Sequence, residues 1–445
     1  MELFELTAFE LQGLIKNKSI TAVELANSVL NRYKNLDDKL KSWVYMDEES
    51  FLNTAQSLDS DSGINKPLKG IPVGLKDIYY TESIPTKAGS KVYEDFVPEF
   101  DATTVTKLKE SQANIMGKTV TTEFACLDPS EAVNPWNPAH TPGGSSSGSA
   151  VAVASMMCPI ALGSQTVGSV LRPAAYNGIV GFKPTSGLVS RFGVVPVSWN
   201  LDTIGWLTRS VQDAALTLDN LIGYDPNDNI SQKFHRSEFS NNLVGESKKK
   251  VALLTGYFTN DIDPEIKAHV YDLVKQLLSN GFEVEEIAPT VDFGKAFKDQ
   301  RLVMAVEAAA FHRENFKTKA DLYRPKLRAM LQQGLEYGAI PYSEALSDLK
   351  QFKFDMINFS DQYDFLITPS TPELPPGDLN TTGSPMFQGP WTAIDFPAIS
   401  LPIGLSESGL PIGAQLIASP FKDLELLQAA YQIESIVGFD ARPDC

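Results

Sequence analysis

The sequence predicts an α/β fold, and three observations carry this prediction. Residues 250–287 have the pattern of a strand, a helix and a second strand, with an apolar run at 251–254, a helix start at Asp263-Pro264 and a stop at Gly281. Short apolar runs elsewhere predict further buried strands. Two capping boxes near the beginning of the chain predict helices.

The expected elements follow one another in this order. Thr7 with Glu10 and Thr21 with Glu24 each form a capping box, so two helices are expected in tandem over about residues 5–35. Residues 70–76 read as a strand that ends at a lysine, and 134–138 is a Pro/Asn-rich loop. A helix of small residues up to 157 and buried strands at 159–162 and 179–182 come next.

The second half is expected to return to the sheet after a long helical segment. A mostly helical insert is predicted for about 293–360, and a strand for 365–368. The segment 396–411 is rich in proline and glycine, and no element is assigned to it. A length of 445 residues corresponds to roughly three units of average domain size, but one α/β core with insertions fits equally well.

Composition limits the partners and cofactors. The net charge is −17, which disfavours nucleic acid or an anionic membrane as the main partner. The first residues are acidic where a signal peptide needs positive charge, so a soluble, cytoplasmic protein is expected. The four histidines form no HxxxH or HxH pair, and we expect no metal and no other cofactor.

The Gly/Ser-rich segment 143–149 is the first candidate for chemistry. Its backbone N–H groups can approach a ligand without obstruction by Cβ atoms, although a flexible solvent-exposed loop explains the same composition. Gly144 to Gly148 matches the G-x-S-x-G hydrolase motif but lacks a preceding strand. Gly117-Lys118-Thr119 resembles the end of a P-loop, but Gln112 stands where the opening glycine should be.

Together with motifs before and after it, this segment resembles the amidase signature family over nearly the whole chain. The resemblance implies a central mixed β-sheet covered by helices on both faces, with a helical insert, in a single domain spanning 1–445. Its parts would be N-terminal helices (about 5–35), a signature core (about 66–225), an α/β and helical insert (about 250–360) and a C-terminal return to the core (about 361–445). The matched segments are 70–77, 122–125, 141–190, 201–203, 208–211 and 396–402.

The resemblance implies a catalytic triad of Lys76 as base, Ser145 as proton relay and Ser169 as nucleophile, with a non-proline cis peptide bond at Ser145. A serine hydroxyl needs a base to become nucleophilic, and a lysine serves only when it is neutral. Burial disfavours the charged amine, so Lys76 must lose water on folding. Taken singly, each residue is explained as well by a surface charge or a turn.

Residues 166–169 can form the oxyanion hole with the N–H groups of Thr166, Val167, Gly168 and Ser169. The family usually has glycine at the position of Val167 and aspartate at that of Gln165, so Val167 must avoid positive φ. Substrate binding is expected from Gly143, Gly144, Ser146 and Arg172. The guanidinium of Arg172 could hold a substrate carboxylate, or it could form an internal ion pair that supports the loop.

Three functions remain open. The first is an amidase that hydrolyses a small carboxamide or acylurea-like amide through an acyl-Ser169 intermediate. The second is the glutaminase subunit of a tRNA-dependent amidotransferase, and the third is a family member that binds amides without turning them over. The substrate depends partly on pocket walls from residues 301–360, where no motif is matched. A homodimer is compatible with the resemblance.

Overall fold

The computed structural model describes residues 2–61, 66–234, 238–245 and 249–445. Both predicted capping boxes are present: the hydroxyls of Thr7 and Thr21 accept from the N–H groups of Glu10 and Glu24, whose carboxylates accept in return. The helices they begin hold their apolar faces against the core. The N-terminal helical elements are η1 (Leu3–Glu5), α1 (Ala8–Lys16), α2 (Ala22–Leu40) and α3 (Glu48–Ser60).

Eleven strands of the described residues form one mixed sheet, in the order β1-β3-β2-β4-β6-β5-β10-β11-β9-β7-β8. The pairs β2/β3, β2/β4, β7/β8 and β7/β9 are parallel and the others are antiparallel. The strands are β1 (Trp43–Met46), β2 (Pro72–Lys76), β3 (Asn114–Thr119), β4 (Ile160–Gln165), β5 (Val180–Lys183), β6 (Thr203–Thr208), β7 (Lys250–Leu254), β8 (Glu283–Ile287), β9 (Phe365–Pro369), β10 (Ala398–Leu405) and β11 (Pro411–Ile417).

Most predicted strands are confirmed, including the parallel pair β7 and β8 with helix α8 (Pro264–Ser279) between them. The segment without an assigned element contains β10 and leads into β11, which form a hairpin. The register of this hairpin shifts between Pro402 and Gly404. A proline is tolerated inside a strand at such an irregularity, and its presence hid the strand from sequence patterns.

Helices cover both faces of the sheet. Successive strand residues point to opposite faces. In β6, a Cβ on Gly205 would lie against Val170, next to α6, whereas the indole of Trp206 donates to Ala214 O of α7. A Cβ on Gly181 would lie 2.5 Å from that of Ala174, so α6 requires glycine to pack this closely. Further helices are η2 (Lys91–Tyr93), α4 (Thr103–Glu110), η3 (Glu123–Ala125), α5 (Ser147–Ala154), α6 (Leu171–Asn177), α7 (Val211–Leu221), η4 (Gly256–Phe258) and α13 (Asp423–Val437).

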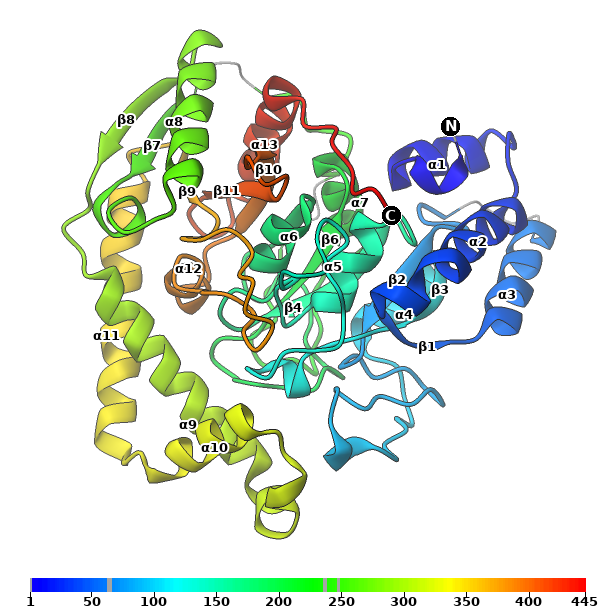
Figure 1. Cartoon of the computed structure of the whole chain (residues 1–445), viewed down its shortest axis with the longest axis horizontal. Coiled ribbons are helices and arrows are strands. Elements are labelled where there is room, and N and C mark those ends of the chain that lie inside the picture. Colours follow the sequence, from blue (N-terminus) through cyan, green and yellow to red (C-terminus); the bar gives the residue numbers. More distant parts are fainter. Residues whose placement is uncertain (1, 62–65, 235–237, 246–248) are drawn as a thin grey trace.

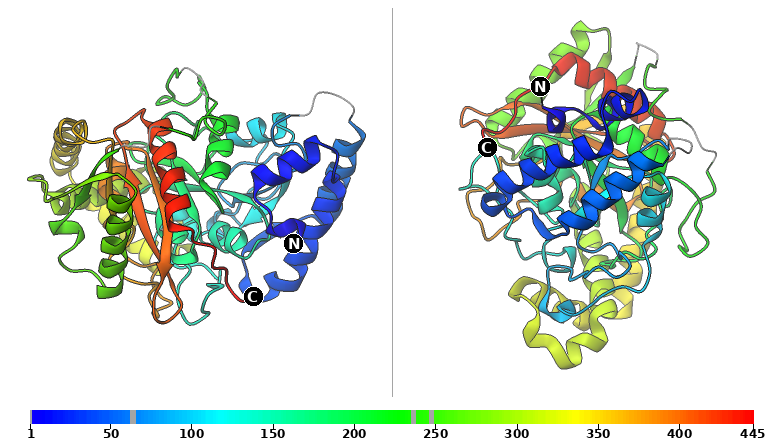
Figure 2. Two further views of the ribbon diagram at one scale, coloured as in Figure 1. Left: turned by 90° about the horizontal axis from the view of Figure 1, so that it is seen from above. Right: turned by 90° about the vertical axis from the view of Figure 1, so that its right-hand side faces the viewer.

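The predicted helical insert lies at the opposite end of the molecule from α1, α2 and α3 (Figure 1, Figure 2). An aromatic cluster ties it to the core: the ring of Phe293 packs against those of Phe258, Phe352 and Trp391. Among the described residues, no helix is long and apolar enough to cross a bilayer. The insert and its neighbour comprise α9 (Phe293–Lys319), η5 (Ala320–Leu322), α10 (Pro325–Glu336), α11 (Ala339–Ser360) and α12 (Gly389–Ala393).

Candidate active site

Lys76 ends strand β2 inside the protein, with none of its surface exposed. Its Nζ donates to Ser145 Oγ at 2.7 Å and to Ser164 Oγ at 3.0 Å. Within the described part of the chain, no carboxylate forms an ion pair with this amine. Burial therefore dominates and lowers the pKa of Lys76 to about 7, against the opposing influence of the Asp202 carboxylate. A substantial fraction of the amine is neutral near neutral pH.

Ser145 stands at the start of the segment that enters α5, and the peptide bond between Gly144 and Ser145 is cis, as the resemblance implies. The carbonyl oxygen of Ser145 accepts from Thr122 N at 3.3 Å and from Thr121 Oγ1 at 3.2 Å. These contacts hold the serine against the end of β3, next to Lys76. Its side chain is buried, and its hydroxyl faces the amine.

Ser169 lies between β4 and α6, on the loop that the sequence predicted to carry the nucleophile. Its carbonyl oxygen accepts from Ser146 N at 3.2 Å, which brings it beside the residue that follows Ser145. The residue keeps 8% of its surface exposed, and its hydroxyl makes no hydrogen bond to the described residues. The three residues Lys76, Ser145 and Ser169 therefore converge from separate segments, and the hydroxyl of Ser169 is available to a reactant.

The carbonyl groups of the 166–169 loop are held from outside. Thr166 O accepts from Gln300 Nε2 at 2.9 Å, and Val167 O accepts from Thr392 Oγ1 at 2.8 Å. The N–H groups of residues 166–169 donate no hydrogen bond to the described residues, and Val167 avoids positive φ. The loop can therefore offer N–H groups to a developing oxyanion.

Gln165 explains how the loop keeps its shape without the usual aspartate. Its Oε1 accepts from Val170 N at 3.0 Å and Leu171 N at 3.1 Å, and its Nε2 donates to Thr392 Oγ1 at 3.0 Å. One side chain thus spans the loop from its first residue to the start of α6. The sequence identified Gln165 as a departure from the family pattern but assigned it no contact.

The predicted substrate-binding residues lie around this loop. Gly143 has φ of +81°, and a Cβ there would lie 3.0 Å from Pro173 Cα, so the position requires glycine. A Cβ on Gly144 would lie 3.0 Å from both Thr122 and Thr382. Ser146 is fully buried, and its Oγ lies 3.4 Å from Ser164 N. These residues shape the backbone beside Ser145 and Ser169.

Arg172 is buried, and its terminal nitrogens are occupied. Nη1 donates to Gly383 O at 2.6 Å, and Nη2 donates to Gly144 O at 2.6 Å and to Thr382 Oγ1 at 3.0 Å. Burial lowers the pKa of Arg172 to about 10. These contacts join the two loops on either side of the site, an arrangement that favours the structural alternative. The partners are backbone carbonyls and a hydroxyl, however, and not the acid of the predicted ion pair.

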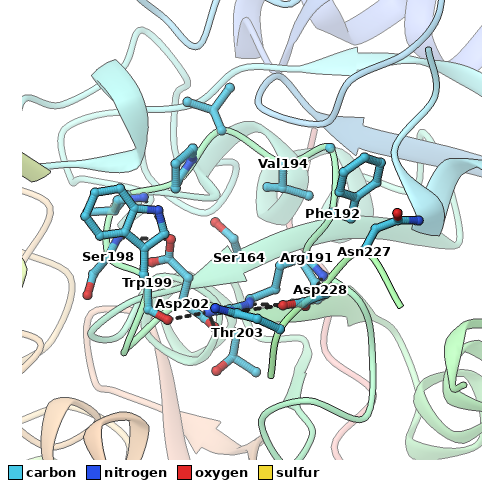
Figure 3. Close-up of a pocket in the computed structure, with 16 residues that line it drawn as sticks. Ser164, Arg191, Phe192, Val194, Ser198, Trp199, Asp202, Thr203, Asn227 and Asp228 are labelled. Carbon is cyan, nitrogen blue, oxygen red and sulfur yellow. Dashed lines mark hydrogen bonds and ion pairs between the residues drawn. The ribbon is translucent and has the colours of Figure 1, made fainter. Parts of the chain in front are cut away.

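A cavity of about 390 Å³ reaches Ser164, the second hydroxyl that contacts Lys76. Figure 3 shows Ser164 among its lining residues, with Arg191 and Asp228 facing each other. The two side chains form an ion pair at 3.0 Å, so this cavity has a compensated charge. Its other wall includes Asp202, whose carboxylate accepts from Thr166 Oγ1 at 2.6 Å. Sequence motifs did not identify Ser164, which lies in the middle of a buried strand.

Comparison with known proteins gives matches over nearly the whole chain. The family model described as Amidase matches residues 24–427. A glutamyl-tRNA(Gln) amidotransferase subunit of Geobacter sp. (strain M21) is 34% identical over 475 aligned residues, covering 98% of each chain. The same subunit of Enterococcus faecalis (strain ATCC 700802 / V583) is 34% identical over 482, covering 99% of this chain and 98% of that one.

Solved structures share the architecture. The peptide amidase PAM, in complex with the competitive inhibitor chymostatin, has a TM-score of 0.87 at 26% identity and covers 99% of both chains. A chain from a vestigial complex linked to the origins of an s-triazine catabolic enzyme has a TM-score of 0.92 at 25% identity, covering 99% of this chain and 100% of that one. Relatives of both kinds therefore extend from the N-terminal helices to α13.

Proposed function

This chain belongs to the amidase signature family, and we propose that it hydrolyses a small carboxamide or acylurea-like amide to a carboxylate and an amine or ammonia. One observation carries the proposal: the fully buried amine of Lys76 contacts Ser145 Oγ at 2.7 Å, with a pKa lowered to about 7 by burial. A neutral amine in this position can accept a proton through a hydroxyl.

In the proposed reaction, Ser169 Oγ attacks the amide carbon while its proton passes to Ser145, whose own proton passes to Lys76. The N–H groups of the 166–169 loop stabilise the oxyanion, and one such donor contributes about 3–4 kcal/mol. The proton then returns through Ser145 to the leaving nitrogen, the C–N bond breaks, and acyl-Ser169 remains. Water deprotonated by the same relay attacks the acyl carbon, and the acid product leaves with Ser169 restored.

A second candidate is the glutaminase subunit of a tRNA-dependent amidotransferase, which would pass ammonia to a partner protein. The 34% identity over 98% of the chain to an amidotransferase subunit supports it. The two candidates share the chemistry at Ser169 and differ in substrate. Hydrolysis of glutamine that depends on an added partner protein would favour the amidotransferase. Turnover of other amides by the isolated chain would favour the stand-alone enzyme.

A serine-directed fluorophosphonate tests the chemistry directly, because attack by Ser169 Oγ on phosphorus releases fluoride and leaves a covalent adduct. We expect mass spectrometry to find the adduct on Ser169 in the wild type, and none in Ser169→Ala. Ser155→Ala is a suitable control, since that hydroxyl only bonds Val151 O within its own helix. A folded wild-type protein that stays unlabelled and turns over no amide would instead support the binding-only alternative.

A further inference from the structure

Arg301 lies on α9 at the point where the insert meets the active-site loop. The preceding residue, Gln300, is fully buried and donates from its Nε2 to Thr166 O at 2.9 Å. This bond fixes one turn of α9 against the loop that carries Ser169. Arg301 is itself partly buried, in the region of the chain where no sequence motif was matched.

The guanidinium of Arg301 has no acid to neutralise it. Within the described residues no carboxylate lies within 4.0 Å of it, and its one hydrogen-bond contact is Nη1 with the thioether sulfur of Met304 at 3.4 Å. The acids beside it on α9 have other partners: Asp299 pairs with Lys295 at 2.7 Å, and Glu307 accepts from Tyr342 OH at 2.7 Å. A partly buried arginine without such a partner is unusual, because removing its charge from water is costly.

The charged and titratable groups near Arg301 leave its positive charge uncompensated. Burial lowers the pKa of Arg301, and the neighbouring Arg172 carries a charge of the same sign. Cys126, which is buried on the opposite wall, also interacts with Arg301, but burial raises the pKa of this thiol, so it stays neutral. Lys76 interacts with the same thiol, which places Arg301 on the side of the site that faces the predicted triad.

We propose that Arg301 binds a carboxylate on the substrate, so that the preferred substrates are short amides with a second, ionised acid group. This inference rests on the proposed amidase function and specifies its substrate class. A planar guanidinium matches a carboxylate through two parallel hydrogen bonds. Arg172 was the sequence-based candidate for this role, but its terminal nitrogens already donate to Gly144, Thr382 and Gly383. Arg301 has no comparable acceptors.

Matched amide pairs test the proposal. Malonamate, succinamate and glutaramate are compared with butanamide, pentanamide and hexanamide, in which an ethyl group replaces the carboxylate. We expect the wild type to prefer at least one acid, and Arg301→Ala to lower kcat/KM for that acid by about tenfold or more, mostly through KM. Its effect on the neutral partner should stay within about threefold. Arg301→Lys, which keeps the charge but not the fork, should fall between.

Arg313→Ala is the matched control, because this arginine is exposed on the same helix and pairs only with Glu314. Equal losses on acid and neutral amides in Arg301→Ala, with circular dichroism unchanged, would overturn the proposal and leave the amidase function standing. A binding readout separates the two ideas. In Ser169→Ala, the preferred acid should raise Tm more than its neutral partner does, and adding Arg301→Ala should abolish the difference. If the acids give no larger Tm shift, the Arg301 proposal fails even in a protein without turnover.

Discussion

The Nζ atom of Lys76 lies 3.0 Å from Ser164 Oγ, on two neighbouring parallel strands of the sheet. Together with Ser145 Oγ, this hydroxyl gives the buried amine two neutral partners. Hydroxyls stabilise the ammonium less than a carboxylate would, and burial therefore lowers the pKa to about 7. The amine that the proposed reaction requires is thus produced by the strands themselves.

The first prediction concerns pH. The reaction needs neutral Lys76, whose pKa is lowered to about 7, so kcat/KM for an uncharged amide should rise with pH through about 7 and level off above it. At lower pH the ammonium cannot accept the proton from Ser145. A pH–rate profile from pH 5 to 9 measures this limb. Activity that falls across this range, or that does not change, would contradict the assignment of Lys76 as the base.

The second prediction concerns Ser164. Ser164→Ala removes a hydrogen bond that the ammonium donates, so the charged form loses stabilisation and the pKa of Lys76 falls further. The acid limb of the profile should move to lower pH by about one unit. Ser155→Ala should leave the limb in place. A limb that stays in place or moves upward in Ser164→Ala would show that this hydroxyl does not tune the amine.

The third prediction concerns Arg172. Arg172→Ala leaves the carbonyls of Gly144 and Gly383 without their donor, at about 1–3 kcal/mol for each buried group. We expect lower Tm and an equal loss of kcat/KM on a carboxylated amide and on its neutral partner, since both loops shift for every substrate. A selective loss on the carboxylated amide would assign the clamp to Arg172 instead.

The fourth prediction concerns the loop support from Gln165. Gln165→Leu orphans the N–H groups of Val170 and Leu171, which both donate to its Oε1. The 166–169 loop should lose its alignment with the oxyanion, so kcat should fall by about 10- to 100-fold with little change in KM. Gln56→Leu, at an exposed position of α3, serves as the matched control. A change confined to KM would argue against a role in the transition state.

Local signals predicted many of the elements, and their failures have physical causes. Thr21 and Glu24 mark the start of α2 because a capping box acts within a single turn. The unit of β7, α8 and β8 was predictable because its apolar spacing and its Asp263-Pro264 start are both local. Strand β10 was missed because Pro402 sits at a register shift whose partner strand contains Gly413. Only that pairing makes the proline acceptable there.

The order of motifs along the chain was sufficient to indicate the family and to nominate Lys76, Ser145 and Ser169 for chemistry. The tertiary structure decided the charge state of Lys76, the saturation of Arg172 by carbonyl groups and the unpaired guanidinium of Arg301. Desolvation and ion pairing depend on distances between groups that lie far apart in the chain, as Lys76 and Ser164 do. A sequence can name such groups, but only the folded packing determines which of them meet and which charges remain uncompensated.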